Sequence, residues 1–90
     1  MTEKPLEWKM KEKIEKEIRK KLTWIKREMK SEIRAIEKAL KELKESVEDD
    51  PGGVCAYLEA DRIAKKISYI LQLRMAACHL SKVLEDEQRN

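Results

Sequence analysis

The sequence has few of the residues that build turns. It contains no Phe, and only two Gly, two Pro and two Cys among its 90 residues. A sheet-rich fold needs Gly, Pro, Asn and Asp at short intervals, so this scarcity argues against one. No apolar run is long enough to cross a membrane, and the first 20 residues carry charges where a signal peptide has an apolar core. We therefore expect a soluble, cytoplasmic, all-α protein with a single domain over residues 1–90 and no membrane partner.

The first half of the chain, from Leu6 to Glu48, contains neither Gly nor Pro. Its apolar residues recur every three or four positions as far as Val47, which is the pattern of a long amphipathic helix. From Leu22 onward the spacing averages about 3.5 residues, which suits a straight partner helix. Before Leu22 every step is four residues, so the stripe turns away around the helix axis. The pattern predicts a helix over about residues 5–48.

A turn and a second helix follow. The chain reads Asp-Asp-Pro-Gly-Gly over residues 49–53, and proline disfavours helical geometry in the residue before it. Asp50 is expected to cap the next helix, with Pro51 at its first position. Residues from Val54 onward again lack Gly and Pro, which predicts a helix over about 54–87. The expected fold is a long antiparallel helical hairpin.

The predicted second helix is apolar around much of its circumference. The first of its two seams comprises Ala56, Ala60, Ile63, Ile67, Ile70 and Ala77, with Ala64, Leu71 and Cys78 beside it. The second, rotated by about 120°, comprises Tyr69, Leu73, Ala76, Leu80 and Val83. One partner helix covers only one seam, and each Leu-sized side chain left in water forgoes about 1.5–3 kcal/mol. We expect the first seam to hold the hairpin and the second to form a homodimer, giving a four-helix bundle.

Other architectures fit the same pattern. A helical protein partner would cover the second seam as well as a second copy does. A break in the first helix near Thr23 or Ser31 would give a three-helix monomer, although neither Gly nor Pro supports such a break. In the hairpin, residues 5–15 overhang the second helix, and we expect them to pack on the other subunit or to fray without it.

The residues capable of chemistry are scattered. Cys55 and Cys78 on one helix would lie roughly 35 Å apart, too far for an intrachain disulfide. We expect free buried thiols, with an intermolecular bridge or a redox role as the alternative. His79, the only His, is expected on the surface, because adjacent helical residues such as Cys78 and His79 chelate poorly. The sequence predicts no catalytic, cofactor-binding or metal site and no small-molecule substrate.

Arg74 is the charged residue that falls within the first seam. An apolar seam accepts an arginine where its head group finds a partner or reaches water. In an antiparallel hairpin Arg74 comes opposite residues near Met29, so we expect a salt bridge to Glu28 or Glu32 that fixes the register.

Basic residues gather on one sector of the first helix. This basic ridge comprises Lys9, Lys13, Lys16, Lys20, Arg27, Lys30, Arg34, Lys38 and Lys41, with Trp24 beside it. It would extend for about 48 Å, long enough to follow a nucleic-acid backbone, and Trp24 could stack on a base or contact a subunit. The net charge, however, is only +3. We therefore expect a non-enzymatic protein–protein interaction and oligomerisation module, with nucleic-acid binding through the basic ridge as the alternative.

Overall fold

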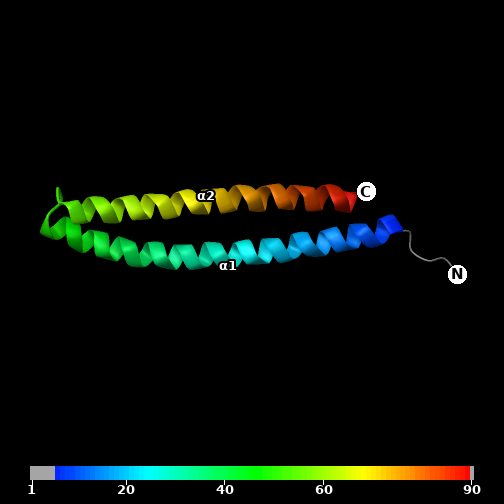
Figure 1. Ribbon diagram of the computed structural model, residues 1–90, viewed down its shortest axis with the longest axis horizontal. Helices are drawn as coiled ribbons and strands as arrows, with labels where there is room; N and C mark the ends of the chain where they lie inside the picture. The colour runs from blue at the N-terminus through cyan, green and yellow to red at the C-terminus, as the bar shows by residue number, and fades with distance from the viewer. Residues whose placement is uncertain (1–5, 90) are drawn as a thin grey trace.

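The computed structural model describes the backbone of residues 6–89 and the side chains of residues 8–87. Over that range the chain forms two α-helices, α1 (Leu6–Asp49) and α2 (Val54–Arg89), and no strand. The helices run antiparallel and side by side in a rod of 75 × 16 × 15 Å (Figure 1). The predicted all-α helical hairpin is confirmed. The expected helix start at residue 5 and the side chain of Leu6 lie outside what is described.

The first helix is continuous. It runs without a break through Thr23 and Ser31, so the three-helix alternative is wrong. The Thr23 hydroxyl donates to the carbonyl oxygen of Arg19, one turn earlier, at 3.0 Å, and is thus accommodated inside the helix. Near the N-terminus Nε1 of Trp8 donates to Oε1 of Glu12 at 2.7 Å, a contact between neighbours on one face of the helix.

A tight turn joins the helices. The Asp50 N–H closes the last turn of α1 at 2.9 Å, and the Gly53 N–H donates to the Asp50 carbonyl oxygen at 3.0 Å. The Tyr57 N–H then donates to the Gly53 carbonyl oxygen at 3.2 Å, so α2 begins after Gly53. The prediction that Asp50 caps the second helix with Pro51 at its first position is therefore wrong. Gly53 takes the capping place, which glycine accepts well.

The core is a single seam between the helices, in which steps of three and four residues alternate. On α1 its buried and half-buried members are Ile18, Leu22, Ile25, Met29, Glu32, Ile36, Ala39, Leu43 and Ser46. On α2 they are Ala56, Glu59, Ile63, Lys66, Ile70, Leu73, Ala77, Leu80 and Leu84. This alternation is the heptad repeat of a left-handed coiled coil. The hairpin is therefore a two-stranded antiparallel coiled coil.

The observed seam differs from the predicted one in which apolar residues of α2 face α1. Leu73, expected at the dimer interface, is only 6% exposed within the single chain. Leu80 lies half-buried in the seam, and Tyr69 and Val83 lie half-buried beside it. Of the five residues predicted for the dimer interface, Ala76 alone is exposed. The surface predicted for dimerisation therefore belongs mainly to the hairpin itself.

The converse correction applies to the seam expected to hold the hairpin. Ile63 is buried and Ile70 half-buried, but Ile67 and Leu71 are 46% and 54% exposed. The prediction traced the seam through apolar residues alone. On α2 the actual seam passes through two charged residues, Lys66 and Glu59, and so leaves other apolar residues outside.

The apolar stripe at the N-terminal end of α1 turns away from the partner helix. Ile18 is 8% exposed, whereas Ile14 and Met10 are 45% and 56% exposed. Steps of four residues rotate successive side chains out of the seam, as the sequence predicted. In Figure 1 this end of α1 extends past the C-terminal end of α2.

Candidate interaction surfaces

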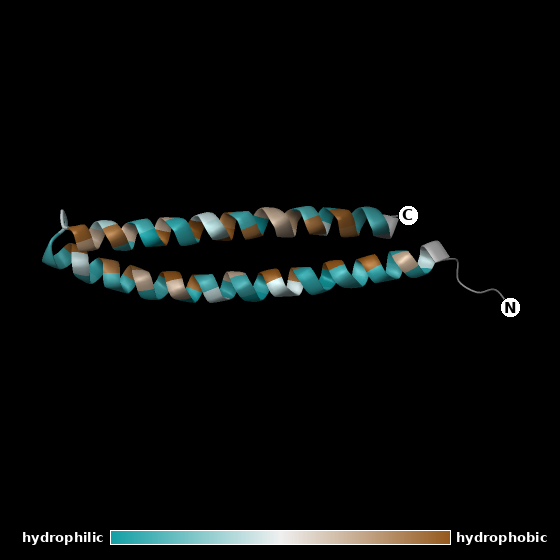
Figure 2. Cartoon of the chain, viewed as in Figure 1, coloured by the Kyte–Doolittle hydropathy of each residue, from teal (hydrophilic) through white to brown (hydrophobic). Residues whose placement is uncertain are grey.

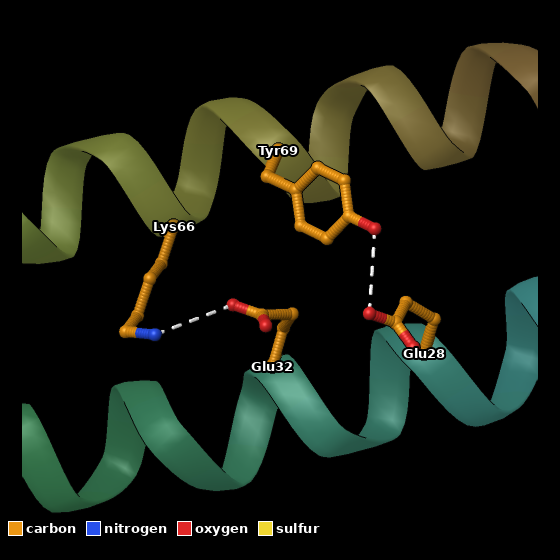
Figure 3. A network of polar contacts seen from close by, with 4 residues as sticks. All are labelled: Glu28, Glu32, Lys66 and Tyr69. Carbon is orange, nitrogen blue, oxygen red and sulfur yellow. Dashed lines mark hydrogen bonds and ion pairs between the residues drawn. The ribbon is translucent and has the colours of Figure 1, made fainter.

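Polar contacts join the two helices near the middle of the rod (Figure 3). Nζ of Lys66 lies 3.5 Å from Oε2 of Glu32, and their side chains are only 30% and 20% exposed. The hydroxyl of Tyr69 donates to Oε1 of Glu28 at 3.3 Å. Arg74, predicted to pair with these glutamates, is exposed instead. The cross-helix ion pair expected in the seam is thus made by Lys66.

The phenol of Tyr69 is held in its neutral form. Partial burial, together with the negative charge of Glu28, the hydrogen bond to it and the charge of Glu32, raises the pKa of Tyr69 above its ordinary value of 10.0. Nearer the turn, the Ser46 hydroxyl donates to Oε2 of Glu59 at 3.2 Å. Each of these contacts gives a hydrogen-bond partner to a polar group that lies partly buried between the two helices.

One side of the seam is polar. A shallow hollow of about 260 Å³ is lined there by Lys38, Glu42, Arg62 and Lys66, with Ala35 and Ala39. Glu28 lies one heptad from Ala35 and two heptads from Glu42. Its contact with Tyr69 is therefore on the same side of the seam as this hollow. We call this side the polar flank. It offers charges of both signs.

The other side of the seam is apolar. Val47, Tyr57 and Ala60 line a groove of about 460 Å³ beside the turn, together with Leu43 and Ala56. Residues one heptad apart share a side of a coiled coil, so this surface continues from Val47 and Ala60 away from the turn. We call it the apolar flank, and it comprises Ile33, Leu40, Val47, Tyr57, Ala60, Ala64, Ile67 and Leu71.

The apolar flank is open to solvent. Its large side chains keep between 44% of their surface exposed, at Val47, and 70%, at Tyr57. Figure 2 shows apolar segments along the whole of α2, whereas α1 is mainly hydrophilic. Sequence reasoning missed the flank as a unit because it placed Ile33, Leu40 and Val47 in the inward stripe of the first helix. A signal was available: the three recur at intervals of one heptad.

The basic ridge lies on the outer side of α1. Every residue predicted for it is exposed, as is Trp24, which is 52% exposed. Lys20 forms an ion pair with Glu17 at 3.8 Å, in which both side chains are about two-thirds exposed. A pair this exposed leaves the cation accessible to solvent. The geometry thus keeps the whole ridge available to a partner.

The remaining reactive side chains are spread along α2. Cys55 and Cys78 are free, as predicted, but both are exposed, so the expectation of buried thiols is wrong. His79 is exposed, as predicted. Among the residues that the structure describes, no group of three His, Cys, Asp or Glu side chains is placed to hold a metal ion.

Comparisons with protein families, with curated proteins and with solved structures found no match to this chain. Within residues 6–89, neither helix has an apolar stretch of the length and composition that a membrane span requires.

Proposed function

We propose that this chain is a non-enzymatic self-association module, in which two hairpins pack their apolar flanks together into a four-helix bundle. The observation that supports this is the apolar flank, where Ile33, Leu40, Val47, Tyr57, Ile67 and Leu71 remain 44–70% exposed on one side of the rod. Two helices share only one seam, so a lone hairpin has no second layer to cover this side. A second hairpin supplies that layer.

The exposed area is sufficient for a modest affinity. Burying a large apolar side chain fully yields about 1.5–3 kcal/mol, and about half of this remains available at each of the six positions. Two subunits together then gain about 9–18 kcal/mol, against an association penalty of about 4–15 kcal/mol. A surplus of about 4–8 kcal/mol, which lies within these ranges, corresponds to a dissociation constant between millimolar and micromolar. The assembly is therefore concentration-dependent.

Sedimentation velocity between about 10 μM and 1 mM tests the proposal. The wild-type chain should shift from monomer to dimer over this range. Leu71→Glu places a charge on the apolar flank and should keep the chain monomeric with its helicity intact. The matched control is Met75→Glu, which changes a 70% exposed apolar residue one helical turn away and outside the flank. A wild-type monomer at 1 mM, or an unchanged dimer in Leu71→Glu, would contradict the proposal.

A second candidate function is nucleic-acid binding through the basic ridge. It is favoured by the exposure of every ridge residue along about 48 Å of one helix. Binding should then weaken steeply with salt, and the slope should fall by about one for each phosphate-contacting residue removed. Lys16→Gln and Lys30→Gln would remove ridge charges, while Lys82→Gln on α2 is the control. Absence of any DNA or RNA complex at low salt would exclude this function.

A further inference from the structure

We infer that the partner on the apolar flank is a second copy lying antiparallel to the first, with only the turn-proximal halves of the two hairpins in contact. This inference rests on the proposed self-association and specifies its geometry. In this arrangement the two-fold axis crosses the rod near Leu40, and the open ends of the two hairpins point in opposite directions.

The first reason is that the apolar flank ends halfway along the rod. On α1, one and two heptads beyond Ile33, the same side carries Lys26 and Arg19. On α2, one heptad beyond Ile67, it carries Arg74. All three basic residues are exposed. The surface is therefore apolar near the turn and positively charged toward the open end.

This division disfavours a parallel dimer with both turns at the same end. Such a dimer would bring Arg19, Lys26 and Arg74 of each subunit against the same residues of the other. Like charges facing one another across an interface oppose association. The antiparallel arrangement avoids this, because the basic half of each hairpin extends beyond the contact.

The second reason is the spacing of apolar residues about the proposed axis. Ile33 and Val47 lie one heptad on either side of Leu40. A two-fold axis near Leu40 therefore sets Ile33 of the second copy against the groove of about 460 Å³ beside Val47 and Tyr57. A groove of this size accommodates a branched aliphatic side chain, and the symmetry fills the equivalent groove on the other copy.

The partner is identified as a second copy because one chain carries both parts of this contact, Ile33 and the groove beside Val47. The acids that precede the turn take no part in it. Asp49 lies one heptad from Glu42, on the polar flank, and Glu48 lies one heptad from Lys41, on the outer side of α1.

Pulsed electron-electron resonance on a spin-labelled chain tests the orientation. Cys55→Ser leaves the exposed Cys78 as the labelling site. Tyr69 contacts Glu28 and Lys66 contacts Glu32, and these contacts align α2 along α1. In this alignment Cys78 lies far from Leu40 along the rod. In the antiparallel dimer the two labels should be about 50 Å apart, whereas a parallel dimer brings them within about 25 Å.

The outcomes separate the two proposals. A distance of about 50 Å supports the antiparallel dimer. A distance near 25 Å overturns the orientation while leaving self-association standing. An absence of dipolar coupling at 1 mM, together with a monomeric mass, overturns self-association and with it the orientation.

Discussion

Replacing Leu73 with Ala should destabilise the hairpin by about 2–3 kcal/mol, whereas the same change at Leu71 should cost under about 1 kcal/mol. Leu73 is 6% exposed, so its truncation loses nearly the whole apolar contact and leaves a cavity in the seam. Such changes cost about 2–5 kcal/mol in globular cores, and a two-helix seam, which solvent reaches easily, belongs at the lower end. Leu71 is 54% exposed, so about half of its transfer free energy is already absent in the single chain.

Urea denaturation followed by circular dichroism, at a few micromolar protein, measures folding with little contribution from association. The two variants should share the wild-type dependence on urea and differ in midpoint, because neither changes the surface exposed on unfolding by much. At about 1 mM, Leu71→Ala should lose additional stability through weaker assembly, while the deficit of Leu73→Ala stays the same. Equal losses for the two variants at low concentration would show that Leu71 also lies in the hairpin core and would refute the assignment of the seam.

Three further tests address the turn and the polar contacts. Gly53→Ala should lower the free energy of unfolding by about 1 kcal/mol, because the added Cβ would lie 2.7 Å from a carboxylate oxygen of Asp50 and 3.2 Å from its backbone oxygen. Gly52→Ala should raise it by about 0.4–1 kcal/mol, because the added Cβ meets open space and Gly52 does not have a positive φ. A double-mutant cycle of Glu32→Ala and Lys66→Ala, measured by urea denaturation, should give a coupling of about 0.5–1 kcal/mol that shrinks in high salt, because the pair is partly exposed. The raised pKa of Tyr69 means that its stabilising effect is complete below about pH 10 and is lost as the pH rises through the folded-state pKa, so Tyr69→Phe should be less sensitive than the wild type to alkaline unfolding.

The fold could be predicted from the sequence because its determinants are local. The spacing of apolar residues and the absence of Gly and Pro define each helix, and the Pro-Gly-Gly segment over residues 51–53 defines the turn. The helix ends fall within two residues of the predicted ones wherever the structure describes them. Each of these signals lies within a few residues of the feature that it predicts.

The seam could not be predicted in the same way because it depends on pairs of residues from different helices. Lys66 enters the seam because Glu32 is within reach across the interface, and Glu59 enters because Ser46 donates to it. A pattern of apolar residues along one helix skips these positions. The predicted seam therefore passes through Ile67 in place of Lys66, and the face of α2 predicted to contact α1 is rotated from the observed one.

The polar residues in the seam also bear on the purpose of the apolar flank. A rotation of α1 that brought Ile33 into the seam in place of Glu32 would also bring Lys26 in place of Ile25 and Arg19 in place of Ile18, because these positions repeat at one heptad. The buried Ile18 and Ile25 therefore hold α1 in its observed rotation. The observed arrangement satisfies Glu32 with Lys66 and leaves Ile33 and Ile67 outside. Ion pairs within a seam select one register, and apolar residues outside it gain their stabilising contact only from another molecule. A hairpin whose own contacts leave such residues uncovered is therefore suited to assembly.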